Sequence, residues 1–161
     1  STPIEKGKTM RILLSMALVV LVSACSTSSQ VQQAHAGLKG RSFDYQFSNR
    51  GGDNAEGIAE LDRVIRERLR SGGWIGNGPA SGKVDVTVTH YYVRHGAARA
   101  LVGIMAGRDK ITSQVRVTDT SGTVLAAFEV ESTNATAWGT TGGLHEKHAE
   151  EIAAQLQGAR P

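Results

Sequence analysis

Cysteine, proline and aromatic residues are scarce in this chain of 161 residues, and each scarcity excludes a class of protein. The chain contains 1 cysteine, 3 prolines and 5% aromatic residues. A single cysteine cannot form an intramolecular disulfide, so the chain is not a disulfide-stapled scaffold. So few prolines, without a glycine repeat, exclude a collagen-like fibre. The hydrophobic content of 40% is enough for one ordinary domain with an aliphatic core.

A strong excess of one charge is also absent from most of the chain, although the pI is about 9.2. The whole sequence has 18 basic and 15 acidic residues. Residues 1–24 hold Lys6, Lys8 and Arg11 against Glu5, which leaves 15 basic and 14 acidic residues for the rest. Because proteins that bind nucleic acid usually carry a broad basic surface, we expect no nucleic-acid partner.

No apolar run is long enough to cross a membrane. The longest, from Ile12 to Val22, has 11 residues after a basic start, whereas a spanning helix needs about 20. This pattern predicts a signal peptide over residues 1–24. Met10 is the expected initiator, which would make residues 1–9 an upstream extension.

The end of this leader reads Val-Ser-Ala-Cys and resembles the lipobox of bacterial lipoproteins. The resemblance implies cleavage before Cys25 and attachment of lipid to that cysteine. Several acyl chains anchor a protein almost permanently. In such lipoproteins Asp after the cysteine favours the inner membrane; here Ser26 follows, which implies the periplasmic face of the outer membrane. The alternative is an ordinary secretory leader beside an unrelated cysteine.

After the leader, we expect residues 25–40 to be the lipidated cysteine and a flexible Ser/Gln-rich tether. Residues 41–157 are expected to form a single domain. Alternating or helical apolar spacing within it predicts four strands and two helices. The strands are expected near residues 43–47, 83–94, 111–118 and 124–130, and the helices near residues 53–71 and 144–157.

This order of elements predicts an α+β fold with two layers. We expect a mostly antiparallel sheet of about four strands, with both helices on one face. Asp119 and Gly122 bound a turn that predicts a hairpin between the last two strands. The first strand–helix–strand unit can be parallel. Asp53 and Glu56 have the spacing of a capping box at the first helix.

The stretch from Gly82 to Glu131 is similar to bacterial lipoproteins grouped as domain of unknown function 4410. It combines a long strand, the Gly- and Ala-rich link GAARALVGIMAG and a D-x-x-G hairpin. The resemblance implies an envelope location and a small α+β domain. It brings no known chemistry and no functional residues. His90 and His95 match nothing in the pattern.

No catalytic, metal or cofactor motif is complete in the sequence. His145 and His148 are three residues apart, whereas a zincin helix needs four, so a metal site would require the fold to bring them to His90 and His95. His148 also falls on an apolar stripe and is expected at the edge of the core.

The glycine-rich stretch 72–78 follows a helix and lacks the Lys-Ser/Thr ending of a phosphate loop, so it predicts a turn that exposes Trp74. We therefore expect no enzyme activity, no metal and no cofactor.

Two surfaces remain as candidates for binding. The small residues Gly96, Gly103 and Gly107, with Arg99, mark an apolar segment that either packs on its own sheet or docks on a partner. Arg63, Arg66 and Arg70 form a basic stripe that is either paired with neighbouring carboxylates or binds an anionic ligand.

The sequence thus predicts an outer-membrane interaction or assembly module with an envelope protein partner. The alternative is a periplasmic binding module for an anionic ligand such as peptidoglycan.

Overall fold

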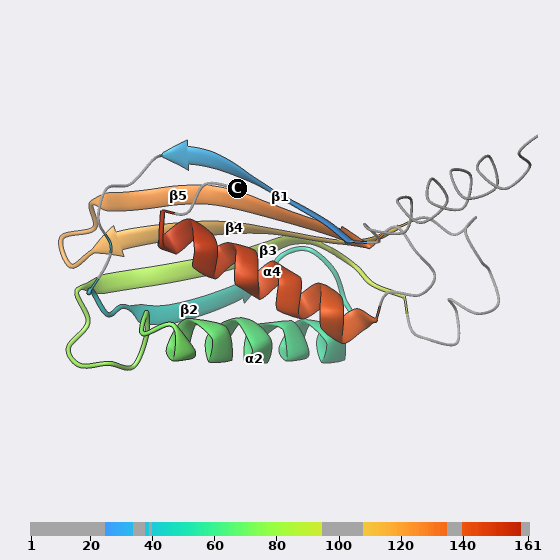
Figure 1. Ribbon diagram of the computed structural model, residues 1–161, viewed down its shortest axis with the longest axis horizontal. Coiled ribbons are helices and arrows are strands. Elements are labelled where there is room, and N and C mark those ends of the chain that lie inside the picture. Colours follow the sequence, from blue (N-terminus) through green and yellow to red (C-terminus); the bar gives the residue numbers. More distant parts are fainter. Residues whose placement is uncertain (1–24, 34–37, 39, 95–107, 135–139, 159–161) are drawn as a thin grey trace, which may run out of the picture.

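The computed structural model describes residues 25–33, 38, 40–94, 108–134 and 140–158. Within them the fold is α+β, with one five-stranded sheet and two helices that cover one of its faces (Figure 1). The predicted class and the two layers are therefore right. No helix in these residues is long and apolar enough to span a membrane.

The sheet is mixed, with the strand order β1-β5-β4-β3-β2. Its strands are β1 (Cys25–Gln33), β2 (Asp44–Asn49), β3 (Gly82–Tyr92), β4 (Asp109–Asp119) and β5 (Val124–Asn134). The first strand–helix–strand unit is parallel, since β2 pairs with β3 in that sense. The other pairings are antiparallel, including the predicted β4–β5 hairpin.

Strand β1 is the element that the sequence did not predict. Residues 25–40 were expected to form a flexible tether, but Cys25–Gln33 pairs along β5, from Cys25 opposite Asn134 to Gln33 opposite Ala127. The expectation failed because a Ser/Gln-rich segment shows no apolar alternation. Its pairing is with backbone about a hundred residues away, which local composition cannot reveal.

Both helices begin at polar side chains that cap free backbone amides. Helix α2 (Ala55–Ser71) is capped by Asn54, whose side chain accepts a hydrogen bond from the Gly57 amide. The capping box expected at Asp53 is therefore one residue too early. Helix α4 (Thr141–Leu156) begins three residues before the expected position, because the Thr140 side chain accepts from the Gly143 amide.

The core lies between the helices and the inner face of the sheet. Helix α2 buries a stripe at helical spacing, and β3 buries every second residue from Val84 to Val88. Trp74 also belongs to this core, with 4% of its surface exposed. The expectation that the glycine-rich turn exposes Trp74 is wrong, because the turn folds its indole back against Gly72 at the end of α2.

Candidate functional site

One end of the sheet holds Cys25, the predicted lipidation site. Cys25 is the first residue of β1 and lies opposite Asn134, the last residue of β5. Asn134 in turn lies opposite Asp109, the first residue of β4. Three strands thus carry Cys25, Asn134 and Asp109 in one row across the sheet; we call this the Cys25 end.

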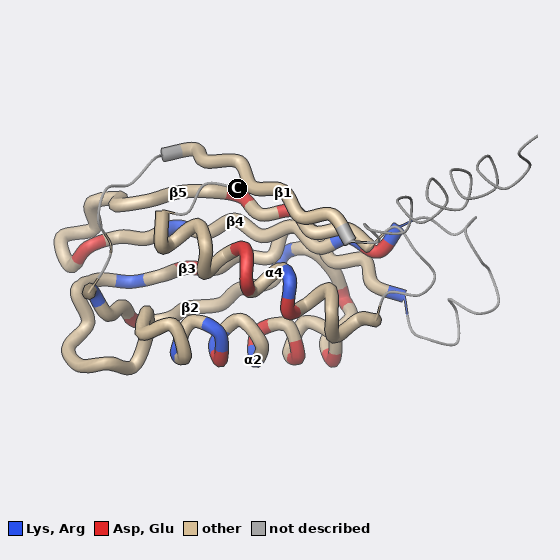
Figure 2. The backbone as a smooth tube through the Cα atoms, viewed as in Figure 1, with Lys and Arg blue, Asp and Glu red and all other residues tan. Residues whose placement is uncertain are grey.

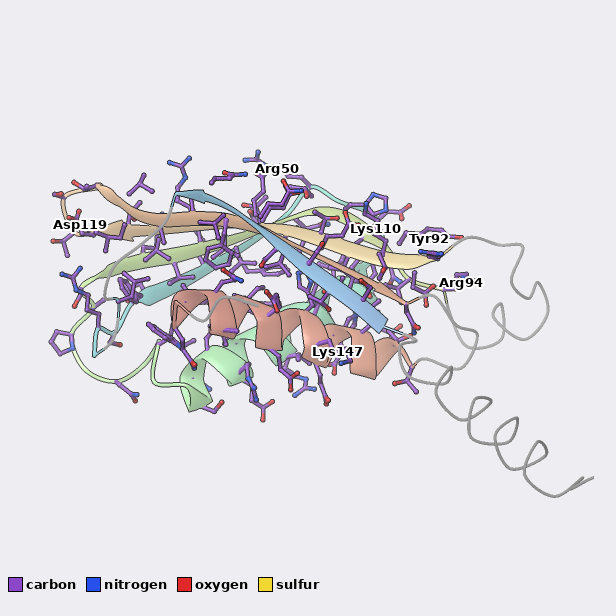
Figure 3. All side chains as sticks on the ribbon, turned by 45° about the horizontal axis from the view of Figure 1, so that its top comes forward. Arg50, Tyr92, Arg94, Lys110, Asp119 and Lys147 are labelled. Carbon is purple, nitrogen blue, oxygen red and sulfur yellow. The ribbon has the colours of Figure 1, made fainter. Side chains whose placement is uncertain are left out.

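A buried ion pair closes the Cys25 end. Arg94 Nε donates to Asp109 Oδ1 at 2.9 Å, and the Arg94 backbone amide donates to the same oxygen at 3.1 Å. The side chains are 10% and 0% exposed. A carboxylate held by a guanidinium and a backbone amide is well satisfied, so the pair fixes the exit of β3 against the start of β4. Figure 3 shows Tyr92, Arg94 and Lys110 at this end and Asp119 at the opposite one.

The Cys25 end is also where two connecting segments leave and re-enter the described structure. Residues 95–107 are flanked by Arg94 and Arg108, and residues 135–139 by Asn134 and Thr140. The predicted partner surface falls in the first segment. Its residues lie outside the described part of the chain: Gly96, Arg99, Gly103 and Gly107.

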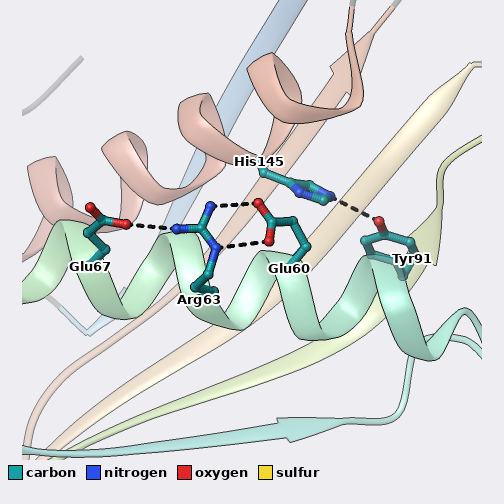
Figure 4. A network of polar contacts seen from close by, with 5 residues as sticks. All are labelled: Glu60, Arg63, Glu67, Tyr91 and His145. Atoms are coloured by element: carbon teal, nitrogen blue, oxygen red, sulfur yellow. Dashed lines mark hydrogen bonds and ion pairs between the residues drawn. The ribbon is translucent and has the colours of Figure 1, made fainter.

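A layer of buried polar groups lies behind the Cys25 end. Tyr91 Oη lies 2.9 Å from His145 Nε2, and both side chains are buried (Figure 4). Burial, with the nearby charge of Asp109, raises the pKa of Tyr91 to about 12. Burial also lowers the pKa of His145, against the opposing effect of Glu60 on α2. The pair is therefore neutral near pH 7 and joins β3 to the first turns of α4.

His148 lies one turn further along α4 and joins the helix to two strands. Its Nδ1 lies 2.9 Å from Ser132 Oγ on β5, and its Nε2 lies 2.8 Å from Ser113 Oγ on β4. All three side chains are fully buried. Burial, followed by the proximity of His145, lowers the pKa of His148 to about 3. The expected position in the apolar stripe is confirmed.

The Ser113–His148–Ser132 arrangement is structural rather than catalytic. A serine nucleophile needs an accessible hydroxyl, a histidine base and usually a carboxylate that orients the base. Here both hydroxyls are buried, and each ring nitrogen is already used by a serine. The arrangement satisfies polar groups inside the core and leaves no route for a substrate.

The described residues contain no group of three or more side chains suited to a metal ion. His145 and His148 face the core from α4, whereas His90 is exposed on β3. His95 lies outside the described residues. The fold therefore does not bring the three described histidines together around a common site.

The basic stripe on α2 is largely paired with carboxylates of the same helix, and Figure 2 shows the two charge types side by side. Arg63 donates to Glu60 at 2.6 and 2.9 Å and to Glu67 at 2.9 Å. The same hydrogen bonds raise the pKa of Arg63. Arg66 pairs with Asp62 at 3.2 Å and lies over the ring of Tyr45, 4.6 Å from its centre. Arg70 is exposed in the last turn of the helix. Arg63 and Arg66 are thus already engaged.

One pocket in the described residues lies between the helices. It has a volume of about 400 Å³ and is lined by charged side chains from α2 and α4, among them Arg68 and Glu150. These two approach to 3.7 Å, and both are about half exposed. A shallow, internally paired groove of this kind offers no convergent set of polar groups to a small ligand.

Sequence reasoning missed three features of this region: strand β1, the Arg94–Asp109 pair and the Tyr91–His145 contact. Tyr91 and His145 are 54 residues apart, and nothing local links them. A weak signal for the ion pair was present, since Arg94 and Asp109 flank the same Gly- and Ala-rich link. Residues that flank one connection between adjacent antiparallel strands lie close together.

Comparison with known proteins supports the domain family that the sequence resembles. The model of the family described as "Domain of unknown function (DUF4410)" matches residues 58–137. No curated protein matches the chain. Among solved structures, two PelC dodecamers from Paraburkholderia phytofirmans have a similar fold.

The two PelC structures come from different crystal forms, and one is of a substituted variant. The variant is 15% identical, covers 85% of this chain and 99% of its own, and has a TM-score of 0.53. The other is 14% identical, covers 84% and 100%, and has a TM-score of 0.58. At such identity the similarity establishes the fold alone.

Proposed function

We propose that this chain is an outer-membrane lipoprotein, anchored through Cys25, that acts as an interaction or assembly module at the periplasmic face of the membrane. The observation that carries the proposal is the position of Cys25 as the first residue of β1. A lipidated residue that directly begins a sheet strand holds the whole domain close to the bilayer. It also fixes which end of the sheet faces the lipid.

Tyr92 at the Cys25 end, and the sequences of the two segments that connect to it, fit this orientation. Tyr92 is 47% exposed there, and tyrosine is a residue typical of membrane interfaces. By sequence, the segment from 95 to 107 is apolar apart from His95 and Arg99, and the segment from 135 to 139 includes Trp138. Thirteen residues cannot span a bilayer, and Arg99 makes deep insertion costly. Contact at the level of the lipid headgroups is consistent with this composition.

The proposed assembly role is supported by the similar fold of PelC, whose structures are described as dodecamers. We extend this to the proposal that the module associates with further copies or with an envelope protein. The alternative, binding of an anionic ligand such as peptidoglycan, is less well supported because Arg63 and Arg66 already have carboxylate partners.

Metabolic labelling with a fatty-acid analogue tests the anchor. The protein should carry the label and fractionate with outer membranes, and Cys25→Ser should lose both properties. Ser26→Asp is the matched variant: it should keep the label and move to the inner membrane. Label on the Cys25→Ser protein would contradict the proposal.

A second experiment tests the ligand alternative with a soluble Cys25→Ser chain and purified sacculi. We expect no retention on the sacculi above that of an unrelated protein of similar charge. Retention that is lost when Arg63, Arg66 and Arg70 are all changed to Glu would instead favour the ligand-binding function.

A further inference from the structure

Strand β1 is held in the sheet mainly by its backbone. None of its described side chains belongs to the hydrophobic core. The outward residues Ser28 and Gln30 are exposed, and the largest inward side chain, Val31, is 54% exposed although it lies opposite the buried Phe128. Edge strands that bury so little depend on the hydrogen-bond ladder, which water can replace.

A side-chain hydrogen bond joins β1 to helix α4. Gln155 Nε2 on α4 donates to Ser29 Oγ at 2.6 Å. The register also shifts between Val31 and Gln33, where the regular pairing is interrupted. Strands that are polar on both faces specify their pairing weakly and are prone to exchange with an identical strand.

We propose that β1 exchanges between neighbouring copies, so that β5 of one copy accepts β1 of another; this inference rests on the proposed anchoring of Cys25. The edge of β5 requires a strand that runs antiparallel to it, presents a small hydroxyl to Gln155 and begins at the Cys25 end. The β1 strand of a second copy in the same membrane meets all three conditions. Anchoring also confines the copies to one plane and raises their effective concentration.

The exchange asks for only a short movement of β1. Four residues, 34–37, separate Gln33 from the buried Leu38. An extended connection of that length reaches about 17 Å. Neighbouring strands are about 4.8 Å apart, so in two copies that meet edge to edge β1 moves by one strand position, about 5 Å. Two copies that face each other along their β1 edges can therefore trade strands.

Cysteine substitutions in two differently tagged copies test the exchange. Gln30 lies directly opposite Glu129, and both point to the uncovered face of the sheet. One copy carries Gln30→Cys and the other carries Glu129→Cys, in the full chain expressed in membranes. The natural sequence has one cysteine, and lipid at Cys25 leaves no other thiol to compete.

Oxidation should yield a disulfide-linked dimer that contains both tags. A disulfide needs Cβ atoms about 3.8 Å apart. Copies that lie edge to edge without exchange keep residue 30 of one copy about 10 Å from residue 129 of the other, so they do not form this disulfide. Pairing Gln30→Cys with Ser121→Cys, in the distant β4–β5 turn, is the matched control and should give no mixed dimer. The double variant on one copy should form an internal disulfide wherever β1 remains in its own sheet.

Internal disulfide without any mixed dimer would overturn the exchange, and so would the absence of both products. The fatty-acid label is read on the same samples. Mixed dimers on unlabelled protein would refute the anchor while supporting the exchange. Labelled protein without mixed dimers would refute the exchange and leave the anchor intact.

Discussion

The Nε2 atom of His148 lies 2.8 Å from the hydroxyl oxygen of Ser113, which joins helix α4 to the middle of the sheet. The opposite ring nitrogen makes the equivalent contact with Ser132 on β5. A neutral imidazole donates through one nitrogen and accepts through the other, so it can satisfy both serines at once. This cross-connection underlies the first two predictions.

His148→Leu should destabilise the fold by about 2–6 kcal/mol. The substitution fills most of the space but leaves two buried hydroxyls without a partner, at about 1–3 kcal/mol each. Urea denaturation measures the change. His90→Ala on the exposed surface of β3 is the control and should alter stability by no more than about 0.5 kcal/mol.

A further variant isolates the hydrogen bonds from the packing. Combining His148→Leu with Ser113→Ala and Ser132→Ala removes all three polar groups together. Most of the lost stability should return, because apolar replacement of both partners is nearly neutral. A triple variant no more stable than His148→Leu would show that the hydroxyls are not the cause.

Acid should destabilise the protein through His148. Its pKa falls from 6.5 to about 3 on folding because the ring is buried. The unfolded chain therefore binds a proton that the folded chain does not, and the associated stability is lost as the pH falls from about 6.5 toward 3. One proton corresponds to a slope of about 1.4 kcal/mol per pH unit.

Comparison of the wild-type chain with His148→Leu isolates this contribution. Across that pH range, the dependence of the unfolding free energy on pH should be weaker in the variant, by about 1.4 kcal/mol per pH unit. His145, whose pKa is also lowered by burial, contributes in the same direction and remains in both proteins. Identical pH profiles would contradict the buried neutral state of His148.

Gly57 lies where a side chain would collide with the Tyr91–His145 contact. A Cβ at this position would overlap the Tyr91 hydroxyl. Gly57→Ala should therefore destabilise the fold by about 1–3 kcal/mol despite the better helix propensity of alanine. Thermal melts of Gly142→Ala provide the control, since nothing lies within 4 Å of that Cβ.

The same collision predicts a coupling between Gly57 and Tyr91. In a Tyr91→Phe background the hydroxyl is gone, so Gly57→Ala should cost clearly less than in the wild-type chain. Equal costs in the two backgrounds would mean that the hydroxyl is not what Gly57 accommodates.

The domain should fold without metal. Among the described residues, no three metal-binding side chains gather in one place. We therefore expect the melting temperature to stay the same when EDTA is added. A fall of many degrees would instead point to a histidine site that includes His95.

The sequence predicted those parts of the fold that rest on local patterns. The alternation at Val84, Val86 and Val88 and the turn from Asp119 to Gly122 are visible without any partner strand, and both are confirmed. Strand β1 has no such pattern, because both of its faces are polar. Its existence depends on pairing with the edge of β5, which is about a hundred residues away in the sequence.

The candidate site was harder to predict for the same reason. The Arg94–Asp109 and Tyr91–His145 contacts depend on how strand ends and helix starts meet in space. The leader pattern pointed to Cys25 as the residue of interest. It did not reveal that a sheet strand begins at this residue. Whether that residue faces the membrane is the central question.

A photoreactive residue placed at Tyr92 or at Ser121 answers that question most directly. Tyr92 lies opposite Lys110, in the same row of the sheet as Ser26, whereas Ser121 lies beyond the far end of β4. The 11 residues of β4 separate the two ends by about 35 Å. Irradiation of cells that express each variant should attach phospholipid at Tyr92 and not at Ser121. Lipid attachment at Ser121 equal to or greater than that at Tyr92 would contradict the proposed orientation.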